Sequence, residues 1–314
     1  MITYLPCNGQ RSQLMQRATK DVLYFETGPD NEPTMFVDPG EEFEVVTQMN
    51  RGPWIEGHPD QERLEAMLTG GNPSSGAIYV NGAEPGQVLT FHILDIQTEQ
   101  FGFTRFRGST DAMPGWMGAT AIGHHEKIVS ISDGVIHWSD DLKFPLEPML
   151  GVVGVAPSNT RWANGWAGEW GGNFDIQEIK TGASVHIPIQ VPGALLHIGD
   201  MHARQGDGEI CGAGGIETGG TARIRCELSP LPDNMTWPRI EDATHIMTTG
   251  ITRPAEDAFR IALSEMLLWL ETDYGFDRGE AYLFLGQVLE ARCTQFVNPT
   301  FSYICKVNKK WLMI

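Results

Sequence analysis

Apolar residues recur every three or four positions in one long stretch near the C-terminal end. Between Pro254 and Tyr274 this spacing predicts an amphipathic helix. Its apolar stripe consists of Phe259, Ala262, Leu263, Met266, Leu267 and Leu270. Pro254 suits the first turn and Gly275 suits the end of the helix. Asp277 then caps a second, shorter helix that we expect to run through Leu285.

Most of the remaining chain alternates apolar and polar residues in short runs, which is the pattern of β-strands. The most regular run has the apolar positions Val185, Ile187, Ile189 and Val191. Pro188 lies within it and lacks a backbone N–H, so we expect this strand at a sheet edge or a bulge. Further strands are expected at 88–96, 149–157, 193–198, 221–228 and 289–297, with a short helix at 61–68. The tail from Lys306 is expected to close the sheet or to fray.

Glycine and proline are spread along the whole chain, with 36 Gly and 19 Pro in 314 residues. This favours many short strands joined by turns over a helical bundle. The sequence therefore predicts an α+β, β-rich fold with sandwich- or barrel-like sheets and a helical segment near the C-terminus. We expect a single domain, 1–314. An alternative division has a β-rich part, 1–245, and a helix-containing part, 246–314.

Side chains able to bind a metal or move a proton are concentrated in one stretch, GDMHARQGDGE (199–209). Asp200, His202, Asp207 and Glu209 fall within it, and Glu217 follows closely. A strand is predicted on each side, and residues at i and i+2 of a strand point to the same face. Asp200 and His202 therefore form one pair, and Asp207 and Glu209 another. A purely structural turn needs the glycines but not a histidine and three acids together, so this stretch predicts a functional site.

A further carboxylate, Asp95, ends the apolar face formed by Leu89, Phe91 and Ile93. A buried acid is costly unless it is paired or binds a metal. With the central acids and the histidine it makes a mixed nitrogen and oxygen donor set without thiolate. Such a set favours Zn²⁺ in an open catalytic site, with Ca²⁺ as the alternative for its all-oxygen part. A water on the ion would be the nucleophile, and Glu209 or Asp207 would move the proton to a leaving amine.

The net charge of −18 makes nucleic acid or an anionic membrane a poor partner for the surface as a whole. Five cysteines without a CxxC pair indicate a reducing compartment rather than a disulfide framework. The N-terminal residues do not resemble a signal peptide, and no apolar run approaches the ~20 residues of a membrane span. We therefore expect a cytoplasmic protein. Cys211 lies beside the central cluster, so a cysteine nucleophile assisted by His202 is an alternative.

Five segments, in the same order along almost the whole chain, resemble motifs of the acetamidase/formamidase family of metal-dependent amide hydrolases. They are NPSSGAIYVNGAEPG (72–86), GVVGVAP (151–157), GGNFD (171–175), GDMHARQGDGE (199–209) and QFVNP (295–299). The chain departs from the family pattern at Gln87, where the family usually has Asp, and at Trp170, where a His commonly precedes the GGN motif.

The resemblance implies a β-rich α+β fold, usually a homodimer, that hydrolyses short linear amides such as formamide or acetamide to carboxylate and ammonia. Carried onto this sequence and joined to the donor chemistry above, it implies three groups of site residues. The metal ligands are Asp95, His202 and Glu217, with Asp200 as a fourth; proton transfer falls to Asp207 and Glu209, and the pocket wall to Asn173 and Asp175. A non-catalytic member that binds a small amide or acid is a further alternative.

Overall fold

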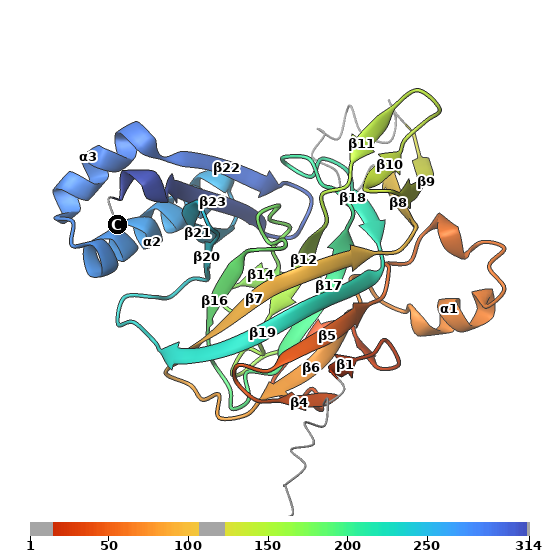
Figure 1. Cartoon of the computed structure of the whole chain (residues 1–314), viewed down its shortest axis with the longest axis horizontal. Helices are drawn as coiled ribbons and strands as arrows, with labels where there is room; N and C mark the ends of the chain where they lie inside the picture. The colour runs from red at the N-terminus through yellow and green to blue at the C-terminus, as the bar shows by residue number, and fades with distance from the viewer. Residues whose placement is uncertain (1–14, 107–122, 313–314) are drawn as a thin grey trace, which may run out of the picture.

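The computed structural model describes residues 15–106 and 123–312, which form two large β-sheets with helices α2 and α3 at one end (Figure 1). Within these ranges, the first sheet has nine strands, in the order β1 (Gln16–Ala18), β5 (Glu42–Thr47), β19 (Gly220–Pro230), β7 (Gln87–Thr98), β16 (Ser184–Pro188), β20 (Arg239–Glu241), β21 (His245–Thr252), β23 (Phe301–Asn308) and β22 (Glu290–Gln295).

The second sheet carries most of the candidate site. Among the described residues it has twelve strands, and its main path is β11 (Lys143–Pro145), β10 (Val135–His137), β9 (His125–Ser132), β8 (Phe101–Phe106), β18 (Ala213–Thr218), β17 (Leu196–His202), β12 (Met149–Gly154), β15 (Gly171–Asn173) and β14 (Ala167–Gly168). Off this path, β6 (Ser74–Val80) pairs with β17, β2 (Leu23–Tyr24) and β4 (Met35–Val37). A separate pair joins β3 (Glu26–Thr27) to β13 (Trp162–Ala163).

Alternation along the strands explains how the two sheets pack. On β19, Ala222, Ile224 and Cys226 are buried, whereas Arg223 and Arg225 between them point outward. The inward residues of the first sheet join those of β6, β12 and β17 in one large apolar core. Strands β12 and β17 are buried along their whole lengths. The β-rich, sandwich-like fold expected from the sequence is thereby confirmed, and the sheets do not close into barrels.

The helices follow the predicted pattern closely. Helix α2 (Ala255–Tyr274) ends at Gly275 in the left-handed conformation, and α3 (Arg278–Val288) is capped by Asp277, whose carboxylate accepts from the amides of Gly279 and Glu280. Helix α2 packs on β21 and β23, and α3 packs on α2 and β23, through a second apolar cluster. The remaining helical segments are short: α1 (Gln61–Met67), η1 (Pro53–Ile55) and η2 (Lys309–Trp311). None of the described helices has the length and apolar character that a membrane crossing needs.

One expectation about strands was wrong. The strand around Pro188, β16, lies inside its sheet, between β7 and β20, and not at an edge. Its partner β20 pairs only with Ser184 to His186. On that side Pro188 therefore has no paired residue in β20 to which a backbone N–H would have to donate. Of the two alternatives for the tail, the structure favours closure of the sheet as far as Asn308, because Lys306 to Asn308 belong to β23, a full strand between β21 and β22. Cys7 lies outside the described residues.

Candidate metal and catalytic centre

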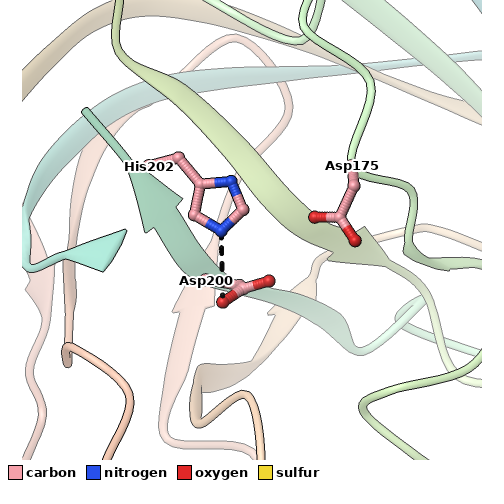
Figure 2. A group of neighbouring side chains, drawn as sticks. All are labelled: Asp175, Asp200 and His202. Atoms are coloured by element: carbon pink, nitrogen blue, oxygen red, sulfur yellow. Dashed lines mark ion pairs between the residues drawn. The ribbon is translucent and has the colours of Figure 1, made fainter. Parts of the chain in front are cut away.

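Strands β15, β17 and β18 of the second sheet bring the central acids and the histidine together, and Figure 2 shows three of these side chains, Asp175, Asp200 and His202. Asp200 and His202 lie on β17, and Glu217 on β18 is the direct cross-strand partner of His202. Asp175 follows β15, which pairs with β12 on the other side of β17. All four side chains are buried.

The backbone is left-handed at three of these acidic positions. Asp200, Asp175 and Glu209 have φ angles of 51°, 47° and 41°. This conformation is sparsely populated by residues other than glycine and costs on the order of 1–3 kcal/mol at each position. At Asp200 the unusual turn falls where β17 leaves β6 and begins to pair with β18. Strain concentrated on three buried acids supports a functional rather than a structural role for them.

A glutamine fixes the ring of His202. The amide oxygen of Gln205 accepts from His202 Nδ1 at 2.8 Å, and its amide nitrogen donates to the Asp175 carbonyl at 2.9 Å. Because an amide oxygen only accepts, Nδ1 carries the proton and Nε2 is directed toward the acids. Nε2 lies 3.7 Å from Asp200 Oδ1 and 3.5 Å from Glu217 Oε1.

These separations are too long for hydrogen bonds and suit ligands that share an ion. Nε2 of His202 has no hydrogen-bond partner among the described residues, although it is fully buried. Two ligand atoms about 2.1 Å from a tetrahedral ion lie about 3.4 Å apart. Donor atoms of Asp175, Asp200 and His202 all lie within 4.8 Å of one another. A Cβ at Gly151 would collide with the carboxylates of Asp175 and Asp200, so glycine there keeps the space open.

Side-chain amides hold the acids from the other side. Asn50 Nδ2 donates to Asp200 Oδ1 at 2.7 Å and to Glu217 Oε2 at 3.0 Å, and Asn72 Nδ2 donates to Asp200 Oδ2 at 3.1 Å. Asn298 Nδ2 donates to Asp175 Oδ2 at 2.5 Å. Sequence reasoning assigned no role to these amides. The quoted motifs nevertheless contain two of them, Asn72 in NPSSG and Asn298 in QFVNP.

Burial and mutual repulsion raise the proton affinity of the centre. Burial, and next the charge of Glu217, raise the pKa of Asp200 to about 8. Burial and then Asp175 raise the pKa of Glu209 well above its usual range. Burial alone would raise the pKa of Glu217, but the charge and close polar contact of His202 and the hydrogen bond from Asn50 together outweigh it and lower that pKa. Likewise, burial opposes the charged form of His202, yet Glu217 and Asp200 raise its pKa. Without an ion, the cluster therefore retains protons.

Glu209 extends the centre from the loop between β17 and β18. Its carboxyl group lies close enough to that of Asp175 for the two to share a hydrogen bond when one proton is present. Asp175 Oδ1 and Glu209 Oε2 receive no hydrogen bond from any described N–H or O–H group. Two such oxygens are stable side by side only with a proton or a cation between them.

The structure does not bring every predicted site residue into this group. Asp95 lies on β7 of the other sheet, half-buried, where its carboxylate accepts from Gln97. Asp207 is 70% exposed and pairs with Arg292 at 2.7 Å. Asn173 is buried on β15, and its side-chain oxygen has no partner in the described chain. Asp175, expected in the pocket wall, lies among the candidate ligands instead.

The alternative nucleophile, Cys211, lines a different pocket. It shares that pocket with Thr104, Lys127 and Trp138. The pocket that reaches Glu217, with Asn50 and Asn72 in its wall, does not include Cys211. This arrangement favours the acids and His202 over the thiol as the centre of chemistry.

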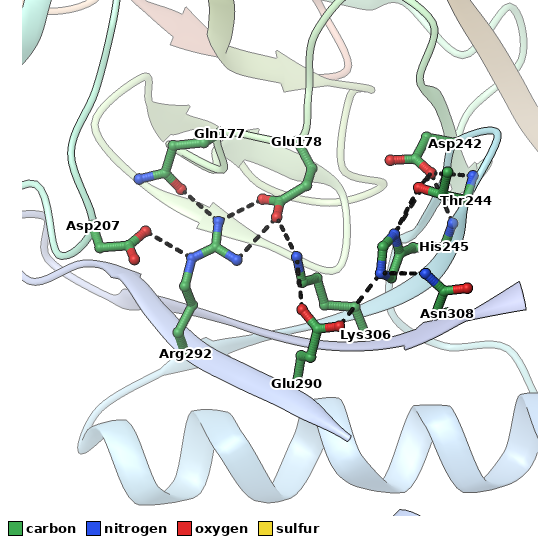
Figure 3. Close-up of polar contacts among 10 residues, drawn as sticks. All are labelled: Gln177, Glu178, Asp207, Asp242, Thr244, His245, Glu290, Arg292, Lys306 and Asn308. Atoms are coloured by element: carbon green, nitrogen blue, oxygen red, sulfur yellow. Dashed lines mark hydrogen bonds and ion pairs between the residues drawn. The ribbon is translucent and has the colours of Figure 1, made fainter. Parts of the chain in front are cut away.

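Ion pairs connect the loops of the centre to the C-terminal strands (Figure 3). Arg292 on β22 donates to both oxygens of Glu178, at 2.9 and 2.7 Å, and to Asp207 at 2.7 Å. Lys306 on β23 approaches Glu178 within 3.2 Å. Glu178 lies three residues after Asp175, and Asp207 lies two residues before Glu209. The network therefore holds both acid-bearing loops against the first sheet.

Comparison with known proteins agrees with the motifs and the fold. The model of the acetamidase/formamidase family matches residues 13–167 and 161–303. A putative formamidase from Schizosaccharomyces pombe is 26% identical over 253 residues, which cover 61% of this chain and 60% of the relative. The formamidase of Methylophilus methylotrophus is also 26% identical, over 254 residues that cover 64% of this chain and 62% of that protein. The chain thus spans about 60% of the length of these curated relatives.

The structural similarity is more extensive. The acetamidase of Bacillus halodurans superimposes with a TM-score of 0.85 at 27% identity, over 95% of this chain and 98% of that one. A predicted acetamidase/formamidase from Thermoanaerobacter tengcongensis gives the same TM-score at 28% identity, covering 95% and 97% of the two chains. Fold, motif order and family match therefore agree: the chain belongs to the acetamidase/formamidase family.

Proposed function

We propose that this protein hydrolyses short linear amides, of the formamide or acetamide type, to a carboxylate and ammonia, and that it depends on a divalent metal. The observation that carries the proposal is the arrangement of Asp175, Asp200 and His202. These residues direct buried donor atoms toward one small space beside a polar pocket, and two of these atoms, His202 Nε2 and Asp175 Oδ1, have no hydrogen-bond partner among the described residues. The names of the relatives supply the substrate class.

Asp175, Asp200 and His202 would hold the ion, with Glu217 beside them. The donor set contains an imidazole and no thiolate, which favours Zn²⁺ over Ca²⁺. When bound, the ion would polarise the amide carbonyl and lower the pKa of water enough to provide hydroxide near neutral pH. Gln205 fixes the tautomer of His202 that leaves Nε2 available.

Glu209 is the residue best suited to deliver a proton to the leaving nitrogen. It is buried against Asp175, and burial and then the charge of Asp175 raise its pKa well above the usual range, which favours its protonated form. Asp207 is exposed and held by Arg292, which suits a structural role. As the C–N bond breaks, a proton from the Glu209 carboxyl group would convert the amine into ammonia. Burial of the cluster keeps bulk water away from this proton.

Elemental analysis of the purified protein, followed by ammonia release from a panel of short amides, tests the proposal. We expect about one equivalent of a divalent ion per chain, with ammonia release that chelation abolishes and the ion restores. Cys211→Ala should retain full activity, whereas loss of activity in that variant together with resistance to chelation would favour the thiol. Failure of the metal-replete protein to release ammonia from any short amide would disprove the function.

A further inference from the structure

The pocket beside the centre is larger than the smallest linear amides require. Its volume is about 360 Å³, and Asn50, Asn72 and Glu217 form its inner wall. Acetamide has four non-hydrogen atoms, and at the ~30 Å³ that a water molecule takes in the liquid it would fill about 120 Å³. A substrate that fills this pocket therefore carries a second group, beyond the carboxamide that reaches the acids.

Two arginines form part of the outer wall of the same pocket. Arg51 and Arg105 both line it. They belong to one side of the opening, because Arg105 Nη1 donates to the Arg51 carbonyl at 3.0 Å. Arg51 directly follows Asn50, whose side chain contacts Asp200 and Glu217. The cationic wall and the buried acids are thus adjacent in both sequence and space.

The charge of this wall is opposite to that of the protein as a whole. The chain carries a net charge of −18, with 22 Lys and Arg against 40 Asp and Glu. Arg51 is exposed, and no acidic side chain of residues 15–106 and 123–312 forms an ion pair with it. Guanidinium groups bind carboxylates through paired hydrogen bonds with well-defined geometry. A local cationic wall on an acidic protein favours an anionic ligand.

The rest of the lining gives little support to an apolar substituent. Gly70, Gly71 and Gly212 contribute backbone rather than side chains, and Thr69 is polar. Among the residues of 15–106 and 123–312 that line the pocket, Leu68 and Ala213 are apolar, and both are already buried against the protein. A long alkyl chain would therefore find few partners in this pocket, whereas a short linker to an anionic group would.

We propose that the preferred substrate is a short amide with a carboxylate at its other end, such as the monoamide of a small dicarboxylic acid. The carboxylate would contact Arg51 and Arg105 while the carboxamide reaches Asp175, Asp200 and His202. This inference rests on the proposed amide hydrolysis. Water is added across the C–N bond, the carbonyl carbon becomes a second carboxylate, and ammonia leaves; the first carboxylate is unchanged.

The test compares two amides of equal chain length, succinamic acid and butyramide, in which a carboxylate replaces a methyl group. Ammonia release gives kcat/KM for each, and calorimetry on the metal-replete enzyme gives binding independently of turnover. We expect wild-type kcat/KM to favour succinamic acid at least about tenfold. Arg51→Gln should lower this ratio about tenfold, mainly through KM, and Arg51→Lys should recover part of it because charge is kept but the paired geometry is lost.

Arg63→Gln is the matched control, since Arg63 is an exposed arginine on α1 that does not line the pocket. It should leave both substrates unchanged. If butyramide and succinamic acid are cleaved equally, the charge preference is wrong and the amidase function stands. If neither is cleaved, but calorimetry shows tighter, Arg51-dependent binding of succinamic acid, the proposed amide hydrolysis is disproved and the preference for an anionic ligand is supported. Equal or undetectable binding of both overturns the inference.

Discussion

Two buried groups of acids in this molecule have opposite electrostatic behaviour. Around β17, Asp200 and Glu209 have raised pKa values because burial and neighbouring acids disfavour their charges. Around β22, Glu178 is also largely buried, yet its pKa is lowered, since Arg292 and Lys306 outweigh the cost of burial. The second group is complete as it stands. The first has excess negative charge that a cation would neutralise, and this difference favours the first cluster as the candidate site and the second as a support.

Removing the imidazole should have the largest effect. His202→Ala takes away the nitrogen donor, and we expect kcat/KM for amide hydrolysis to fall at least about 10³-fold, with loss of bound metal. Elemental analysis and ammonia release on the same preparation measure both. His58→Gln, in a surface loop, is the control and should retain metal and activity. A His202→Ala protein with full metal content and activity would show that the β17 cluster is not the centre.

Changing an amide that holds the acids should have an intermediate effect. Asn50→Asp keeps the size of the side chain but places another carboxylate against Asp200 and Glu217. We expect a 10–100-fold loss of activity or metal affinity, about the effect of altering groups that orient metal ligands. Titration with the metal, followed by calorimetry, provides the measurement. Unchanged affinity would mean that Asn50 only fills space.

Breaking the complete cluster should act mainly on stability. Glu178→Gln leaves Arg292 and Lys306 without their shared carboxylate, and we expect a loss of about 3 kcal/mol in the free energy of unfolding. Because the folded-state pKa of Glu178 lies below its unfolded value of 4.5, the wild-type advantage is fully present above that pH. It is lost as pH falls through the folded pKa. Denaturant unfolding at several pH values checks this, and an advantage that grows toward acid would contradict it.

The metal-free centre should show the opposite pH dependence of stability. The folded pKa of Asp200 is about 8, against an unfolded value near 3.8. Its contribution to stability is therefore fully present below about pH 4 and is lost as pH rises toward 8. Thermal unfolding of chelated protein should show Tm falling by a few degrees across this window. Added metal should raise Tm most at the alkaline end; equal effects at pH 5 and 8 would refute the assignment.

The sequence predicted elements whose signal is local. Helix α2 was predicted almost to the residue, because its apolar stripe and the residues that bound it, Pro254 and Gly275, all lie in one continuous segment of the chain. The β17 pair Asp200 and His202 was also found locally. Asn50 and Asn298, in contrast, reach the acids across 150 and 123 positions of chain, and no periodic pattern records such contacts.

Asp95 shows how a small backbone irregularity changes the face to which a side chain points, although the alternation before it is regular. Leu89, Phe91 and Ile93 are buried as alternation requires. The register with β19 then shifts, so that Ile224 faces Ile93 but Arg223 faces Asp95. One extra residue on β7 reverses the alternation, which buries Ile96 and turns Asp95 away from the inner face. Bulges of this kind depend on the partner strand and are not visible in one strand's sequence.

The asparagine side chains around the acids carry the same functional group as the proposed substrate. Asn50, Asn72 and Asn298 are themselves primary carboxamides, held beside a centre proposed to cleave primary carboxamides. Each directs its nitrogen at an acid, and the Asn50 oxygen accepts from the Asn72 backbone N–H at 2.8 Å. Hydrolysis of any of these side chains would replace a hydrogen-bond donor to an acid with a further carboxylate, as Asn50→Asp does, and a mass gain at these asparagines would be the signature of that loss.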